Sequence, residues 1–372
     1  MRVLLVSLSL LFSLSAQSQH NWLIASDADS GPGSLRAAIE EANVLCNTPQ
    51  TACSITFFDH PESLPKTINI VTPLPAITAC NLLIRSQERP PDLPQFTWGI
   101  SSNNVDGEGL VLIPRCEGSR IDIDGFSISG FRRDAIAIPA PVQARYVLNR
   151  LNLSSQSRGL AVDSSRADVT VSNSTIGNTG RSAVTIWSAA TTVLENVGIG
   201  LAGNFAAPVR ASGVFLGPNA GEVLIRNCRI AHSAHFGLAL ARGNAVIRLE
   251  NTRIFNNAMA IDWGLDGPTP NVPDDIPDTP RVTVATYDAA RNVTVVTIDP
   301  QGGAPARLEL WASARVTNLA TAELDRFAGG AEVTDGSAVT IEVPGDLRGL
   351  YVSALRVELT RLSELSAGVA VR

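Results

Sequence analysis

Arg229, His232, His235 and Arg253 are the residues whose types and spacing come closest to a catalytic set. A desolvated arginine or a histidine can move a proton, and a guanidinium group can hold the carboxylate of an acidic sugar. The two arginines hold equivalent places in successive repeats, so all four could converge. The simpler interpretation, which we favour, is that both arginines are solvated strand residues and both histidines lie in an exposed turn.

Aspartates gather after the last repeat, in a segment rich in proline and glycine. They are Asp262, Asp266, Asp274, Asp275 and Asp278. Carboxylate oxygens at loose spacing are acceptable ligands for Ca²⁺, which is the only cofactor that the sequence suggests. The spacing is not that of an EF-hand, and aspartate is common in exposed loops, so the alternative is a loop without metal.

A repeat running from about Ile121 to Trp263 must position these residues. One landmark is an Asn three residues before an aliphatic residue, with Gly or Arg replacing Asn in two earlier coils. The pairs are Gly125/Ile128, Arg150/Leu153, Asn173/Ile176, Asn196/Ile199, Asn227/Ile230 and Asn251/Ile254. The second landmark is an apolar strand centred on Ile136, Leu160, Val184, Val214, Leu238 and Ile261, at spacings of 24, 24, 30, 24 and 23 residues.

Self-similarity at this period indicates units that bury a core only by stacking on their neighbours. Short β-rich segments joined by Gly, Asn and Ser turns predict parallel strands with right-handed crossovers. The one longer spacing places an insertion at 201–212. We therefore predict an all-β fold, a right-handed parallel β-helix.

The recurring asparagines should stack at one corner of this helix. They are Asn173, Asn196, Asn227 and Asn251. Val223 and Ile225 precede Asn227 with a period of two, so strand alternation predicts that its side chain points inward. We expect buried amides that hydrogen-bond to one another, and an outward column of alternating charges formed by Glu195, Arg226 and Glu250.

The outward residues of the second landmark strand are mostly small or apolar. They are Ala137, Ala161, Thr185, Phe215, Ala239 and Asp262. We expect loops or a C-terminal domain to cover this strip, and the alternative is a docking face.

Residues 1–18 contain Arg2, an apolar run and small residues at Ala16 and Ser18, which is the pattern of a secretory signal peptide. The run is short for a membrane span. Export would place the cysteines in an oxidising compartment. We expect Cys46 to pair with Cys53, and Cys80 with Cys116, leaving Cys228, although sequence alone leaves other connectivities open.

A helix is predicted within 27–43, with Ser34 as its N-cap. Its apolar face would consist of Leu35, Ala38, Ile39 and Ala42. An amphipathic helix in this place covers the open end of the first coil, where unpaired strand edges would invite aggregation.

The stretch DSGPGSLRAAIEEAN, followed by ITFFD and by the N-x-x-I coils, resembles the extracellular bacterial right-handed parallel β-helix repeat proteins of the pectin-lyase-like class. The resemblance extends over about Asp27 to Asp278. It implies a fold and a location that is secreted, periplasmic or on the cell surface, and it implies an activity only weakly.

The C-terminal quarter has a different pattern. A Pro- and Asp-rich linker at 264–280 separates the β-helix at 19–263 from residues 281–372, which alternate as short antiparallel strands. The strand count predicts a small β-sandwich of immunoglobulin-like type, as often follows β-helices of the class that the chain resembles.

A net charge of −6 argues against nucleic-acid binding, and no apolar segment after the signal is long enough to span a membrane. We expect a secreted or surface-associated scaffold, non-catalytic, for adhesion or glycan binding, with an extracellular polysaccharide or a cell-surface molecule as partner. The first alternative is a polysaccharide lyase or glycoside hydrolase that acts on an extracellular glycan, such as a polyuronate. The second is a structural envelope module without a ligand.

Overall fold

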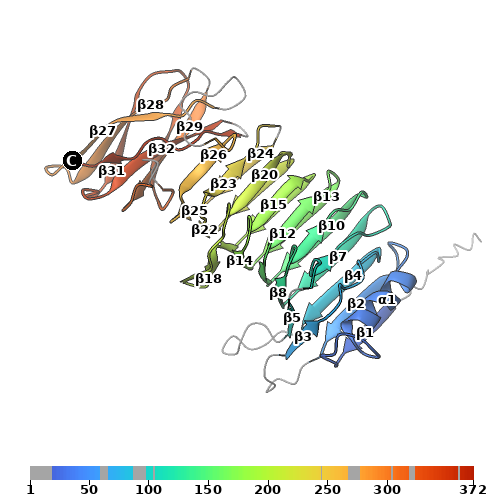
Figure 1. Ribbon diagram of the computed structural model, residues 1–372. Helices are drawn as coiled ribbons and strands as arrows, with labels where there is room; N and C mark the ends of the chain where they lie inside the picture. Colours follow the sequence, from blue (N-terminus) through green and yellow to red (C-terminus); the bar gives the residue numbers. More distant parts are fainter. Residues whose placement is uncertain are drawn as a thin grey trace, which may run out of the picture.

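The computed structural model describes residues 19–58, 66–86, 98–103, 105–243, 245–266, 277–302, 305–317, 323–358 and 361–372. The predicted signal peptide at 1–18 lies outside these residues. Stacked coils fill the middle of the molecule, with one helix at the N-terminal end and antiparallel sheets at the C-terminal end (Figure 1). The predicted right-handed parallel β-helix is confirmed.

Three parallel sheets run the length of the β-helix. The first consists of β1 (Gln19–Ile24), β2 (Ala52–Phe57), β4 (Asn81–Ser86), β7 (Ser119–Asp124), β10 (Ala144–Asn149), β13 (Ala167–Ser172), β16 (Thr191–Glu195), β21 (Glu222–Arg226) and β24 (Val246–Glu250). The second consists of β3 (Lys66–Ile70), β5 (Trp98–Ser102), β8 (Phe126–Phe131), β11 (Asn152–Ser155), β14 (Thr175–Thr179), β17 (Gly198–Ile199), β22 (Arg229–Ala231) and β25 (Arg253–Phe255). The third consists of β6 (Leu110–Val111), β9 (Ile136–Ile138), β12 (Leu160–Asp163), β15 (Val184–Ser188), β20 (Val214–Asn219), β23 (Phe236–Leu240) and β26 (Met259–Trp263).

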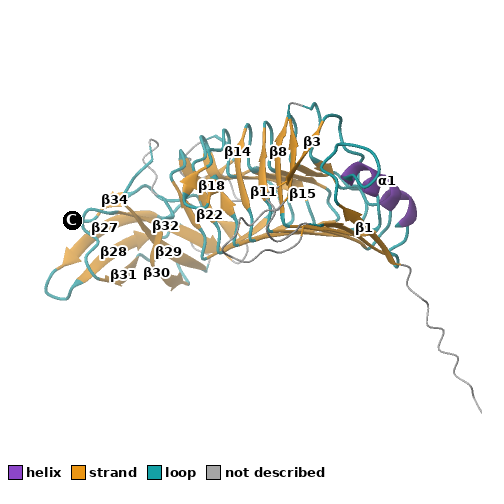
Figure 2. Cartoon of the chain, turned by 90° about the horizontal axis from the view of Figure 1, so that it is seen from below, coloured by secondary structure: helices purple, strands orange, loops and turns teal. Residues whose placement is uncertain are grey.

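The core lies between these sheets (Figure 2). Ile136, Leu160, Val184, Val214, Leu238 and Ile261 pair in register along the third sheet, and each is fully buried. The second landmark of the repeat is therefore a single inward column. Burial of one such aliphatic side chain stabilises the fold by about 1.5–3 kcal/mol, so each added coil strengthens the core.

The asparagine corner departs from the prediction. Asn173, Asn196, Asn227 and Asn251 are exposed, so their predicted inward orientation is wrong. Their φ angles lie between +46° and +55°, as does that of Arg150 at +50°, and Gly125 has φ +87°. A left-handed residue ends the strand and breaks its alternation, and Asn and Gly adopt this conformation most readily. The landmark therefore marks a turn between the first and second sheets.

The exposed amides still bond to one another along this corner. Asn196 Nδ2 donates to Asn173 Oδ1 at 3.2 Å, and Asn251 Nδ2 donates to Asn227 Oδ1 at 2.7 Å. The charged column beside them stacks in register, and Arg226 Nε lies 2.9 Å from Glu195 Oε1. The hydrogen bond to Glu195 raises the pKa of Arg226 above its usual value.

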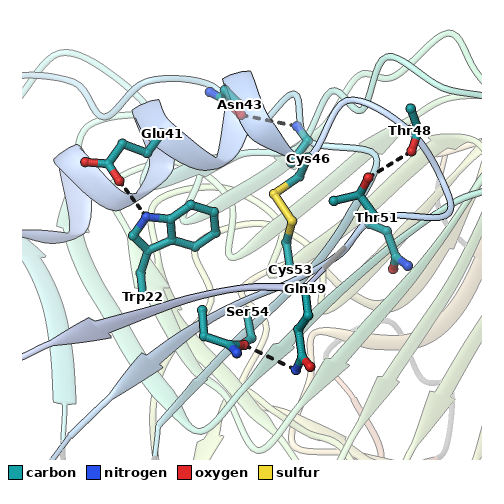
Figure 3. Close-up of a disulfide and its surroundings, with 12 residues drawn as sticks. Gln19, Trp22, Glu41, Asn43, Cys46, Thr48, Thr51, Cys53 and Ser54 are labelled. Atoms are coloured by element: carbon teal, nitrogen blue, oxygen red, sulfur yellow. Dashed lines mark hydrogen bonds between the residues drawn. A yellow bond between two sulfur atoms is a disulfide. The ribbon is translucent and has the colours of Figure 1, made fainter. Parts of the chain in front are cut away.

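Helix α1 (Leu35–Leu45) covers the first coil, as predicted. Ser34 is its N-cap and accepts from Ala37 N, and the buried residues are Leu35, Ala38, Ile39 and Ala42. Trp22 Nε1 in β1 donates to Glu41 Oε2 at 2.7 Å (Figure 3). Asn43 Oδ1 accepts from Thr78 N at 2.7 Å. The helix is thus attached to two successive coils.

Both predicted disulfides are present. Cys46, at the C-cap of α1, is bonded to Cys53 in β2, with Cα atoms 6.2 Å apart (Figure 3). Cys80 and Cys116 have Cα atoms 5.3 Å apart and precede the paired strands β4 and β7. Cys228 is free and buried, and burial raises the pKa of its thiol to about 11.

Two antiparallel sheets follow the β-helix. One contains β27 (Arg281–Asp288), β28 (Val293–Asp299) and β31 (Val339–Pro344). The other contains β30 (Arg326–Val333), β29 (Ala306–Ser313), β32 (Tyr351–Glu358), β33 (Arg361–Leu362) and β34 (Val369–Ala370). The sequence did not predict β30. Val296 of β28 and Leu308 of β29 belong to one core cluster, so the two sheets pack against each other. The immunoglobulin-like type of this domain stays a prediction.

The C-terminal part closes the open end of the last coil. Ile254 N donates to Leu324 O at 2.8 Å, and Leu324 N donates to Ile254 O at 2.9 Å, forming an antiparallel bridge. Trp263 Nε1 donates to Leu362 O at 2.9 Å, and its backbone N donates to Glu364 Oε1 at 3.1 Å. These bonds satisfy backbone groups that have no further coil to pair with.

Asn227→Val tests the left-handed turn. A β-branched residue is strained at φ +54°, and it also removes the acceptor of Asn251 Nδ2. We expect the free energy of unfolding to fall by about 1–2 kcal/mol, measured by urea denaturation. Asn227→Gly also removes the acceptor but tolerates the backbone angle, so it should cost less. Equal losses in the two variants would contradict this explanation.

Candidate functional site

Of the four candidate catalytic residues, Arg229 and Arg253 lie side by side on neighbouring strands, but the two histidines lie elsewhere. Arg229 and Arg253 pair in register, and their guanidinium carbons lie 5.7 and 5.0 Å from the centre of the Phe255 ring. Arg253 forms an ion pair with Asp325, and Arg229 Nη1 donates to Asn204 Oδ1 at 3.4 Å. Arg253 is therefore held by an ion pair, whereas Arg229 makes one long hydrogen bond and its buried Nε has no hydrogen-bond partner among the described residues.

The two histidines occupy the turn between the second and third sheets. His232 is half-buried at φ +55°, and His235 is exposed, with its ring 6.2 Å from that of Phe236. Among the described residues, neither side chain bonds to Arg229 or Arg253. This arrangement does not bring the four residues to one point.

The predicted calcium ligands are spread over different environments. Asp262 is fully buried in β26, Asp266 is exposed in the following turn, and Asp278 is half-buried. Asp274 and Asp275 lie outside the described residues. Within the part of the chain that is described, no three acidic, histidine or cysteine residues form a group suited to a metal ion. Calcium binding stays a prediction from the sequence.

The best candidate site is a cleft between the last coil and the C-terminal sheets, because aromatic and charged side chains line it together. It has a volume of about 440 Å³. Its lining residues come from both sides of the junction and are Leu249, Glu250, Asn251, Thr252, Arg253, Arg307, Glu309, Trp311, Asp325 and Phe327. We call it the junction cleft. Three of these residues, Glu250, Asn251 and Arg253, were singled out from the sequence.

The aromatic wall of the junction cleft comes from neighbouring antiparallel strands. Trp311 in β29 and Phe327 in β30 pair in register, with their ring centres 5.4 Å apart in an edge-to-face arrangement. The Trp311 side chain is nearly covered, whereas Phe327 is 47% exposed. One ring therefore supports the other, and Phe327 presents its apolar surface to the cleft.

Charged groups complete the lining. Arg253 is paired with Asp325, and Arg307 Nε lies 3.6 Å from Glu309 Oε1. Trp311 Nε1 donates to Glu309 Oε2 at 3.3 Å. Burial raises the pKa of Glu309 despite Arg307 and the indole, because the charged carboxylate loses water. The cleft thus holds the largely desolvated carboxyl of Glu309 and the carboxylate of Asp325, which is paired with Arg253.

A second hollow, of about 580 Å³, lies across the turns between the second and third sheets. Its lining is polar and consists of Ser155, Gln156, Asn178, Thr179, Gly180, Pro208 and Arg210. Unlike the junction cleft, it has no aromatic side chain in its lining. It offers hydrogen bonds without an aromatic surface, so it is the weaker candidate.

The comparison with family models agrees with the fold. A family model described as a right-handed beta helix region matches residues 99–270. No curated protein matches the chain. A solved structure of the enzymatically active domain of tailspike protein 2 from bacteriophage CBA120 is similar at 9% identity and a TM-score of 0.30, covering 82% of this chain and 68% of that one.

Glu309→Gln tests the desolvated carboxyl. A raised folded-state pKa means that the contribution of Glu309 to stability is fully present below its unfolded pKa and is lost as pH rises through the folded pKa. Glutamine keeps an acceptor for Trp311 and carries no charge. We expect the melting temperature of the variant, relative to the natural protein, to be higher at pH 7 than at pH 4.

The matched control is Glu222→Gln, at an exposed position on β21. Its melting temperature relative to the natural protein should not change in this way with pH. A pH-independent difference for Glu309→Gln would contradict the assigned desolvation.

Proposed function

We propose that this protein is a secreted or surface-associated scaffold that binds a glycan in the junction cleft, without turning it over. The observation that carries the proposal is the combination of an exposed aromatic ring with fixed, hydrogen-bonding charged groups in one hollow. A sugar ring presents an apolar C–H face and a rim of hydroxyl groups, so it is complementary to both parts of such a lining.

The geometry of the cleft supports binding by a rigid surface. Phe327 is held by Trp311, and Arg253 is held by Asp325. The opposite wall begins at the turn around Asn251, whose side chain is bonded to Asn227 of the preceding coil. Side chains that are already ordered lose little conformational entropy when a ligand binds.

The charge balance favours a neutral glycan. Three carboxyl groups, those of Glu250, Glu309 and Asp325, line the cleft beside the guanidinium groups of Arg253 and Arg307. The carboxylates of a polyuronate would meet like charges, which costs affinity. Hydroxyl groups of a neutral sugar, by contrast, can donate to carboxylates and accept from guanidinium groups.

We also propose that the protein is exported from the cytosol. Two disulfides are compatible with an oxidising compartment outside the cytosol. Among the described residues, no helix is long and apolar enough to cross a membrane. Together with the signal-like segment at 1–18, the disulfides support export.

A glycoside hydrolase is the second candidate function, because the cleft contains carboxyl groups in unlike environments. Burial raises the pKa of Glu309, as suits a general acid, while Asp325 is held by Arg253. Release of reducing ends from a bound glycan, abolished by Glu309→Gln, would favour this function over simple binding.

Phe327→Ala tests the proposed function. Loss of the exposed ring should weaken binding of the glycan that the natural protein selects from an array by about tenfold or more, because central aromatic contacts dominate such interfaces. The matched control is Phe205→Ala, which removes an aromatic ring that is 80% exposed on the hairpin of β18 (Leu201–Ala202) and β19 (Phe205–Ala206). Equal binding by both variants and the natural protein would contradict the proposal.

A separate assay tests the lyase alternative. We expect no unsaturated uronate product from pectate, alginate or glycosaminoglycans with Ca²⁺ present, because Arg253 is paired with Asp325 and, among the described residues, neither histidine bonds to an arginine of the set. Ultraviolet absorbance of the product is the measurement. Product formation that both Arg229→Ala and His232→Ala abolish would establish an enzyme instead.

A further inference from the structure

Two aromatic rings stack on the outer face of the third sheet, away from the residues of the junction cleft. Trp187 in β15 and Phe215 in β20 have ring centres 5.7 Å apart and planes 13° apart. In the outward row predicted from the sequence, Ala161, Thr185, Ala239 and Asp262 are buried, whereas Ala137 and Phe215 are half-buried. Trp187 differs, since it is 49% exposed.

Regular strand alternation turns the indole outward, because Trp187 follows the inward Ile186, and a register shift lies at the same place. Ile186 pairs with Val162, and Ser188 pairs with Asp163, so Trp187 is an extra residue relative to β12. The shift continues on the other side, where Ser188 pairs with Asn219. Gly217 makes room there, because a Cβ atom at its position would lie 2.6 Å from the Trp187 carbonyl oxygen. The bulge therefore leaves Trp187 without a partner residue on β12.

A column of polar residues begins at the position that follows Trp187 in the sequence. Ser188 Oγ donates to Asp163 Oδ1 at 2.9 Å, and Asp163 and Asn219 are exposed. Asp163, Ser188 and Asn219 pair in register across three adjacent coils and so form a column. Ser188 is the residue that follows Trp187 in the sequence. Strand spacing sets neighbouring members about 4.8 Å apart, which is close to the size of one sugar ring.

We propose that Trp187 and Phe215, with the column of Asp163, Ser188 and Asn219, form a second binding site for a neutral pyranose unit. The C–H face of the sugar stacks on the indole, and its equatorial hydroxyl groups bond to the carboxylate, hydroxyl and amide groups. Among the described tryptophans, Trp187 is the one with about half of its surface exposed, at 49%. It is also followed in the sequence by Ser188, which is hydrogen-bonded to Asp163. No arginine or lysine belongs to the column, so the site does not select an acidic sugar.

This inference shares the ligand class of the proposed function but uses no residue of the junction cleft. Either site can therefore fail without the other. A second copy of this chain that covers the same rings is the main competing occupant, and sedimentation velocity separates it, because the natural protein would then dimerise and Trp187→Ala would not.

The test uses cellohexaose, mannohexaose and xylohexaose as probes against the full chain. We expect at least one of them to protect Trp187 from acrylamide quenching and to bind about tenfold or more weakly to Trp187→Ala, as loss of a central aromatic contact should produce. Trp187→Phe should retain most of the affinity, and Phe327→Ala should leave the protection of Trp187 unchanged.

Three results would overturn the inference. The first is that none of the three hexasaccharides protects Trp187 from quenching. The second is that Asp163→Ala and Asn219→Ala both bind the hexasaccharide with the affinity of the natural protein. The third is that the natural protein dimerises through the two rings. Binding that is lost in Phe327→Ala but intact in Trp187→Ala would support the junction cleft alone.

Discussion

The open edges at the two ends of the β-helix are the constraint on which this structure depends. Inside the solenoid, every coil receives its backbone hydrogen bonds from the coils before and after it. The first and last coils lack one neighbour, and unpaired edges are both unsatisfied and prone to aggregation. Helix α1 and its disulfide to β2 close one end, and residues around Leu324 and Leu362 close the other (Figure 1).

The closure of the C-terminal end also creates the main candidate site. The bridge between Ile254 and Leu324 places Asp325 and Phe327 beside the turn at Asn251. The core is continuous across this junction, because Trp311, Leu324 and Leu355 belong to the same cluster as the coil residues. The walls of the cleft are therefore fixed by packing, as a binding surface requires.

Repetition explains what the sequence could predict. The inward column around Leu160 and the capping face of α1 follow from periodicity alone, because a wrong phase would expose apolar side chains. The asparagine corner was misjudged because period-two alternation was carried one residue too far. Asn227 has a positive φ, and the recurrence of Gly125 at the equivalent place was the signal that a turn lies there.

Neither of the two proposed binding surfaces could be predicted by the same reasoning. The walls of the junction cleft come from two distant segments, one around Arg253 and one around Phe327, and only the packing of the C-terminal part joins them. Strand β30 was missed because Gly329 and Gly330 interrupt its pattern. The stacking of Trp187 on Phe215 joins residues of two different coils and leaves no mark in the repeat spacing.

The most direct test of the central claim is hydrogen exchange of the Leu324 amide, which donates to Ile254 O across the junction. If the C-terminal part closes the last coil, this amide will be protected to a degree similar to that of Leu160, which donates to Ala183 O inside the solenoid. Exchange of Leu324 at the rate of exposed turns, with Leu160 still protected, would contradict the claim.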